Sequence, residues 1–110
     1  MKLPNSNRAE IAPEKLRDYL LSPSHPVGRF KSRFFRSLGY TTENWESLAD
    51  ALLRVAEGGN AEEVPSPFGR KFAVAGEILN RDGEPVAILT VWIVPPDDEN
   101  PRFVTAYPQE

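Results

Sequence analysis

The sequence has 110 residues, 40% of them hydrophobic, and a formal net charge of −3 at pH 7, which suits a single domain around one core. The lack of cysteine and the single histidine exclude a disulfide framework and a cysteine- or histidine-rich metal centre, so we expect neither a metal nor another cofactor. No apolar run is long enough to cross a membrane and no hydrophobic leader follows Met1; we therefore expect a cytoplasmic protein without membrane contact.

Helical spacing of apolar residues predicts three helices in the first half of the chain. The first lies in APEKLRDYLL, begins at Pro13 and carries Tyr19 on its apolar face, and the prolines of SPSHP end it. The second lies in PVGRFKSRFFRSL. The third lies in TTENWESLADALLRVAEGG, with Thr42 as its N-terminal cap, and ends at the two glycines.

The pattern changes to that of strands in the second half. RKFAVAGEIL alternates between apolar and polar positions, Asp82-Gly83 marks a hairpin turn, VAILTVWIV is apolar enough for a central strand, and RFVTAY is a last strand. The expected fold class is therefore α+β, with three N-terminal helices followed by a curved antiparallel β-meander of three to four strands. We expect one domain over 1–110, with a helical part at 1–57, a linker at 58–67 and the sheet at 68–108.

Charge is unevenly distributed along the chain. Residues 1–40 carry eight Lys or Arg against three acids, a net +5, whereas residues 41–110 carry five against thirteen, a net −8. This split predicts either a polarised surface, whose positive part binds phosphates and whose negative part binds a basic partner, or charges that intermix once the chain folds.

The second predicted helix combines an apolar and a basic face. It begins near Pro26, with Ser24 or His25 as its cap, and its apolar stripe consists of Val27, Phe30, Phe34, Phe35 and Leu38. A different face holds Arg29, Arg33 and Arg36, which form either a solvated surface or an anion-binding one. Lys31 falls inside the apolar stripe. Its amine either reaches water along a packed stem or enters a cleft where it meets an anion.

His25 lies at the N-terminal end of that helix, and its imidazole is the side chain best suited to proton transfer near neutral pH. An ordinary surface histidine between two prolines is the alternative interpretation. On the strands, Thr90 shares a face with Trp92, and Thr105 shares one with Tyr107. If the two strands are neighbours, Thr90 and Thr105 are expected across from each other.

These residues give a set of candidates for a phosphate-handling site. The predicted catalytic residues are His25, Lys31, Thr90, Thr105 and Tyr107. The predicted substrate-binding residues are Arg29, Arg70, Lys71, Trp92 and Arg102. For the threonines the alternative is strand propensity without function, and for Arg70 and Lys71 it is a solvated strand end.

Two segments, KLRDYLLSPSHPVGRFKSRFFRSLGY and TVWIV…PRFVTAYP, resemble a family of small bacterial domains of unknown function along nearly the whole chain. That family is similar, more remotely, to the metal-independent ribonuclease toxins of the barnase–EndoU–colicin–RelE group. The resemblance implies helices before a curved sheet, with His25 and Lys31 on the helical part and Thr90, Thr105 and Tyr107 on the strands. It also implies a small cognate partner, such as an antitoxin.

Two functions are expected from these observations. The first is a toxin-type ribonuclease that cleaves RNA by attack of a 2′-hydroxyl on the adjacent phosphate, with His25 in proton transfer and Lys31 in charge stabilisation. The second is a non-catalytic interaction module, similar to an antitoxin or immunity protein, whose acidic half over 41–110 binds a basic partner. The acidic net charge is unlike that usual for a free-standing ribonuclease toxin.

Overall fold

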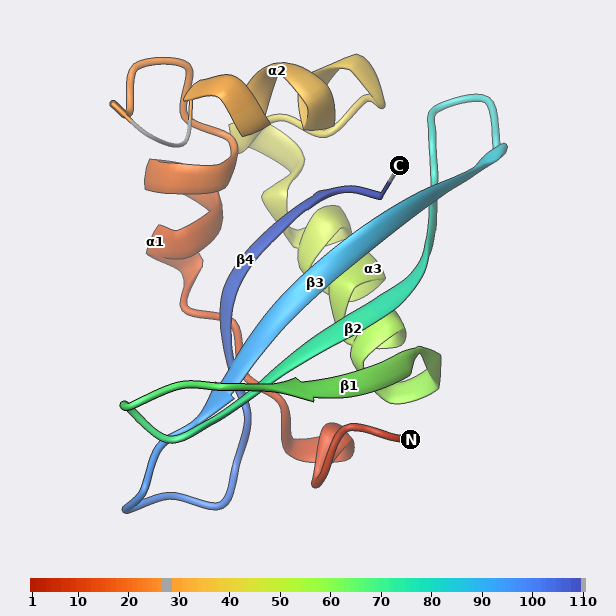
Figure 1. The fold of residues 1–110 in the computed structure, drawn as a ribbon. Helices are drawn as coiled ribbons and strands as arrows, with labels where there is room; N and C mark the ends of the chain where they lie inside the picture. Colours follow the sequence, from red (N-terminus) through yellow and green to blue (C-terminus); the bar gives the residue numbers. More distant parts are fainter. Residues whose placement is uncertain (27–28, 110) are drawn as a thin grey trace.

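The computed structural model describes residues 1–26 and 29–109 and has an α+β fold (Figure 1). The helical part consists of the 3₁₀ turn η1 (Ser6–Arg8), the short helix α1 (Pro13–Lys15) with its π-helical continuation η2 (Leu16–Leu20), α2 (Arg29–Ser37), the 3₁₀ turn η3 (Thr42–Asn44) and α3 (Trp45–Gly58). The strands are β1 (Asn60–Val64), β2 (Arg70–Leu79), β3 (Pro85–Val94) and β4 (Arg102–Pro108).

The four strands form one antiparallel sheet in the order β1-β2-β3-β4, which confirms the predicted meander. The predicted hairpin turn joins β2 to β3. Gly83 has a φ of 79° there, and the Asn80 side chain accepts hydrogen bonds from the backbone N–H groups of Asp82 and Glu84. The run VAILTVWIV is β3, an inner strand between β2 and β4, as its apolarity predicts.

The predicted linker at 58–67 is wrong, because its middle forms β1. Asn60–Val64 pairs with Lys71–Ala75 of β2, so the sheet starts eight residues before the predicted position, 60 against 68. Only Ala61 of this strand is buried, opposite Val74. An edge strand with a single buried side chain leaves almost no apolar alternation to find in NAEEV.

One helix boundary also differs from the prediction, and another lies next to residues that the structure does not describe. The cap of the third helical segment is Thr41 and not Thr42, since the Thr41 hydroxyl accepts a hydrogen bond from the Glu43 N–H, and Asn44 bonds back to the Thr41 N–H. One turn of 3₁₀ helix then precedes α3. The second helix is expected to begin near Pro26. Residues 27–28, which include Val27 of its predicted apolar stripe, lie outside the described residues.

The core lies between α3 and one face of the sheet. Phe72, Val74 and Trp92 are fully buried on this face, together with Leu48 and Leu52 of α3, and burial of such side chains is the main source of stability in a small domain. In Figure 1, α3 lies behind the sheet, whereas α1, η2 and α2 lie beside and above β4.

The opposite sheet face, called here the open face, carries Ala73, Ala75, Leu89, Val91, Thr105 and Tyr107.

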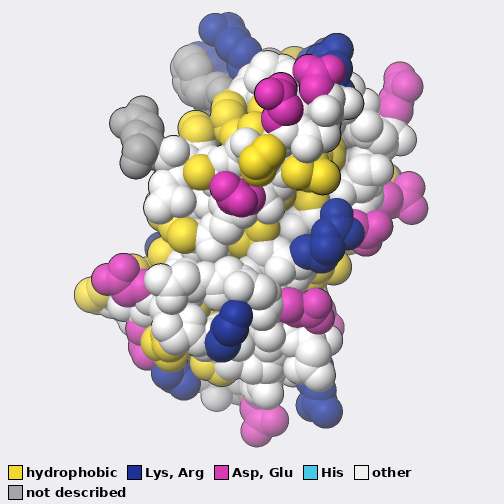
Figure 2. Space-filling model, turned by 90° about the vertical axis from the view of Figure 1, so that its right-hand side faces the viewer, with side chains coloured by type: hydrophobic (Ala, Val, Ile, Leu, Met, Phe, Trp, Pro, Cys, Tyr) yellow, Lys and Arg dark blue, Asp and Glu magenta, His cyan; other side chains and the backbone are white. Residues whose placement is uncertain are grey.

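On the side of the molecule shown in Figure 2, acidic and basic side chains are intermixed. None of the helices within the described residues is long and apolar enough to cross a membrane.

Candidate functional site

Lys31 is the centre of a polar cluster between α2 and β4. Its Nζ donates hydrogen bonds to Tyr19 Oη and to Thr105 Oγ1, both at 2.9 Å, and the side chain is half-buried. Its position in the apolar stripe directs it toward the sheet, as the sequence pattern predicts. The amine therefore has two hydroxyl partners within the protein, whereas the predicted contact with an anion in a cleft stays a prediction.

Thr105 reaches this cluster because β4 is irregular. The register shifts between Val91 and Trp92, so Trp92 pairs with Phe103 but Val91 pairs with Thr105. The extra residue, Val104, is a bulge, and a bulge changes which face the following side chains occupy. Thr105 and Tyr107 consequently lie on the open face, while Ala106 is buried in the core.

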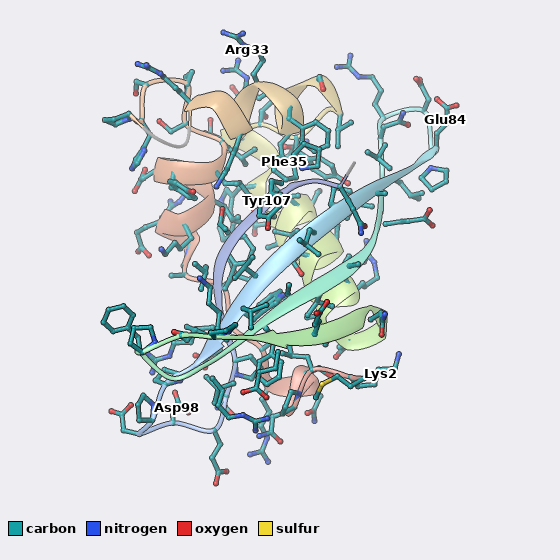
Figure 3. The ribbon with its side chains drawn as sticks, in the orientation of Figure 1. Lys2, Arg33, Phe35, Glu84, Asp98 and Tyr107 are labelled. Atoms are coloured by element: carbon teal, nitrogen blue, oxygen red, sulfur yellow. The ribbon has the colours of Figure 1, made fainter. Side chains whose placement is uncertain are left out.

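Tyr107 extends the cluster along β4. The ammonium of Lys31 lies 5.7 Å from the centre of its ring, within the range of a cation–π contact. Figure 3 shows Tyr107 on the strand, below α2. The cluster therefore combines a cation, two hydroxyl groups and an aromatic ring beside a partly open surface.

Tyr19 belongs to this cluster but is not among the residues predicted for the site. Its hydroxyl lies 3.1 Å from Thr105 Oγ1 and accepts from Lys31, and the ammonium of Lys15 lies 5.8 Å from its ring centre. Spacing with Leu16 and Leu20 marked it only as part of an apolar face. Its polar hydroxyl beside two buried leucines was the one available signal.

The electrostatic environment of Tyr19 favours its phenolate. Burial alone raises the pKa of the phenol, but hydrogen bonds from Lys31 and Thr105, with the positive charges of Lys31 and Lys15, outweigh that effect and hold the pKa below its ordinary value. A phenol with a lowered pKa is a better proton donor near neutral pH than an ordinary tyrosine.

His25 joins the cluster through Tyr19. The two rings meet edge to face, with 5.0 Å between their centres and an angle of 84°. The His25 carbonyl accepts a hydrogen bond from the Arg29 N–H at the first residue of α2. The imidazole and the ammonium thus contact the same tyrosine.

Thr90 and Trp92 belong to the core and not to this cluster. Thr90 pairs with Ala106, so the expectation that it lies across from Thr105 is wrong. Its fully buried hydroxyl donates to the Val74 carbonyl at 2.9 Å and accepts from the Trp92 indole N–H at 2.8 Å. Both side chains have 0% exposure, which removes them from contact with a ligand.

The four basic substrate-binding candidates lie on α2, β2 and β4. Arg70 binds Glu63 through two hydrogen bonds, and Arg102 binds Asp98 at 2.8 Å. Lys71 lies on β2, opposite Ile93 of β3. Arg29 lines a hollow on the outer face of α2. The cluster itself thus unites His25, Lys31, Thr105 and Tyr107 of the predicted set.

Within 1–26 and 29–109, no group of three or more histidine or acidic side chains has an arrangement that would hold a metal ion. The groups that the cluster offers are an imidazole, an ammonium, two phenols and an alcohol. This set can transfer protons and neutralise an anionic oxygen by hydrogen bonding.

The chain belongs to a family described as a domain of unknown function (DUF6883), whose profile matches residues 2–110. No curated protein matches the sequence. Among solved structures, the fold is similar to a chain of a contact-dependent growth inhibition toxin–immunity protein complex from Klebsiella pneumoniae 342. The TM-score is 0.69 at 14% sequence identity, with 96% of this chain and 97% of that chain covered.

Proposed function

We propose that this DUF6883 domain is a toxin-type, metal-independent ribonuclease that cleaves RNA through attack of a 2′-hydroxyl on the adjacent phosphate. The observation that carries the proposal is the placement of Lys31 Nζ, 2.9 Å from both Tyr19 and Thr105 at the open face, with His25 against Tyr19. The fold shared with a chain of a toxin–immunity complex agrees with a toxin-related role.

In the proposed reaction His25 accepts the proton of the 2′-hydroxyl. The 2′-oxygen then forms a bond to phosphorus, and the bond between phosphorus and the 5′-oxygen breaks. Tyr19 gives a proton to the leaving 5′-oxygen, for which its lowered pKa is suited. Exchange with solvent returns a proton to Tyr19 and removes one from His25, so the cycle closes without a metal or a protein nucleophile.

Lys31 stabilises the charge that accumulates on the non-bridging oxygens of the phosphorane. Tyr19 and Thr105 hold the ammonium in place before substrate binds, and preorganised charge of this kind is often the largest single contribution to catalysis. Thr105 also orients the phosphate, and Tyr107 offers a ring face on which a base can stack. Thr90 and Trp92 have no part in this proposal, because both are buried.

Incubation of the purified protein with total RNA in the presence of EDTA tests the proposal. The wild type should fragment the RNA, and the His25→Ala, Lys31→Ala double variant should leave it intact. Lys2→Ala is a matched lysine control, since Lys2 donates to the Gly58 carbonyl, outside the cluster. Equal, intact RNA with wild type and double variant, after removal of any bound partner, would overturn the proposal.

A second candidate function is that of a non-catalytic partner of such a toxin. It is favoured by the similar solved structure, which is a complex of a toxin and an immunity protein, and by the net −8 of residues 41–110. Either function implies a cognate partner protein. Expression of the chain alone separates the two, because a toxin should arrest growth of its host and an immunity-type protein should not. Growth arrest that Lys31→Ala abolishes would favour the ribonuclease.

A further inference from the structure

The outer side of α2 carries a second basic feature, separate from Lys31. Arg29, Arg33 and Arg36, called here the arginine face, line a hollow of about 280 Å³ together with Pro23 and Ser32. Figure 3 shows Arg33 directed away from the sheet, on the opposite side of the helix from the labelled Tyr107. The α2 sequence RFKSRFFRS contains four cations and no acid.

Arg33 and Arg36 differ from the arginines of the sheet in their partners. Arg70 and Arg102 each form a salt bridge with a carboxylate of this chain. Arg33 and Arg36 form none within the described residues, although both are exposed and both border the hollow. A guanidinium matches a carboxylate through two parallel hydrogen bonds. The guanidinium groups of this pair are therefore accessible to carboxylates of another molecule.

The buried hydroxyl of Ser32 in this hollow already has a hydrogen-bond partner within the protein. Ser32 is only 2% exposed, and its hydroxyl donates to the Arg29 carbonyl at 3.0 Å. An incoming group therefore meets the exposed guanidinium groups of Arg33 and Arg36 and the apolar ring of Pro23. This combination of a small hollow and charged rim suits one or two acidic side chains.

We infer that the arginine face is a docking surface for an acidic segment of a partner protein, with Asp or Glu side chains bound between Arg33 and Arg36. The inference concerns association and does not depend on ribonuclease activity. Charge complementarity of this kind mainly fixes orientation and accelerates encounter. It also gives a specific contact to a chain whose net charge of −3 would otherwise repel an acidic partner.

An RNA strand fits this surface less well. A strand bound at Lys31 and Tyr107 lies on the sheet side of α2 and would have to pass around the helix to reach Arg33. The described residues that line the hollow include no aromatic ring on which a base could stack, whereas single-stranded RNA usually binds on such rings.

Fluorescence anisotropy with two labelled probes tests the inference. The probes are poly-L-glutamate and a 2′-O-methyl oligouridine, which resists cleavage at its 2′ position. The Arg33→Gln, Arg36→Gln variant should weaken poly-L-glutamate binding on the order of tenfold or more, as expected for loss of charge-assisted hydrogen bonds. Its binding of the oligouridine should stay close to that of wild type.

The Arg8→Gln, Arg54→Gln variant is the matched control, because it removes the same charge from two exposed arginines outside α2. It should bind poly-L-glutamate nearly as well as wild type. No binding of poly-L-glutamate by wild type, or equal losses in the two double variants, would overturn the inference. So would an equal loss of oligouridine binding in Arg33→Gln, Arg36→Gln, which would identify a nucleic-acid surface. Ribonuclease activity measured in parallel reports separately on the proposed function.

Discussion

Each face of the sheet carries a threonine whose hydroxyl is hydrogen-bonded, but the two threonines have different surroundings. Thr90, on the core face, is fully buried and joins the Val74 carbonyl to the Trp92 indole. Thr105, on the open face, holds the ammonium of Lys31 beside Tyr19. Each hydroxyl has two hydrogen-bond partners. The partners of Thr90 lie in the core and stabilise the strand pairing, whereas those of Thr105 are side chains that water and ligands can reach. Residue type therefore says less about function than the face on which a residue lies.

The largest expected effect is on the core face. Trp92→Ala removes a fully buried ring that packs against Phe103 and should lower the free energy of unfolding by about 3–5 kcal/mol. Unfolding in a chemical denaturant measures this loss of stability. Trp45→Ala, at a half-buried tryptophan on α3, is the control and should cost less. Equal losses would show that the Thr90–Trp92 side of the sheet is not the main core.

On the open face, Lys31→Met should change activity and not stability. Loss of the ammonium should lower the rate of RNA cleavage on the order of 100-fold, in the range measured for one preorganised transition-state contact. Tyr19 and Thr105, already 3.1 Å apart, can hydrogen-bond to each other in the variant. Initial rates on a labelled RNA and a thermal melt check the two halves of this prediction. A variant that cleaves like wild type contradicts the assignment of Lys31.

The two threonines allow a direct test of the difference between the faces. Thr90→Val leaves the indole N–H of Trp92 without an acceptor in the core and should cost about 1–3 kcal/mol of stability. Thr105→Val, at a half-buried position, should cost less than about 1 kcal/mol and reduce cleavage. Chemical denaturation and the cleavage assay should rank the variants in opposite orders. The same order in both assays would remove the distinction.

The smallest effect concerns the tyrosines and pH. Hydrogen bonds and positive charges hold the pKa of Tyr19 below 10.0, whereas burial raises that of Tyr40 above it. Titration followed by tyrosinate absorbance in the Tyr19→Phe and Tyr40→Phe variants should show Tyr19 ionising first. If Tyr40 ionises first, the electrostatic account of the cluster is wrong.

The lowered pKa of Tyr19 makes the stability of the fold depend on pH. The folded protein releases the Tyr19 proton at lower pH than the unfolded chain does, so the unfolded chain holds more protons between the two pKa values. Stability from this group therefore rises with pH across that window, is complete above 10.0 and is lost as pH falls through the folded pKa. Tyr19→Phe should remove this part of the pH dependence.

Much of the fold could be predicted because its signals are local. The period of apolar residues gave the helices and inner strands, and the same period put Lys31 on the inward side of α2. β1 was not predicted, because four of its five residues are not buried and only Ala61 belongs to the core. Strand formation there depends on pairing with β2, which NAEEV alone does not encode.

The composition of the site depended on less local features. A bulge at Val104 sets whether Thr105 faces the core or the open side, and a slip of one residue exchanges the two faces. The expected pairing of Thr105 with Thr90 holds only for a β4 strand without this bulge. Tyr19 was missed because its role depends on a contact with Thr105, 86 positions away.

The most direct test of the central claim is to map the ends of RNA fragments made by the wild-type protein in EDTA. Attack by the 2′-hydroxyl predicts fragments that end in a 2′,3′-cyclic phosphate on one side and a 5′-hydroxyl on the other, and predicts their disappearance with Lys31→Met. Fragments that begin with a 5′-phosphate, or no fragments beyond those of Lys31→Met, would contradict the account.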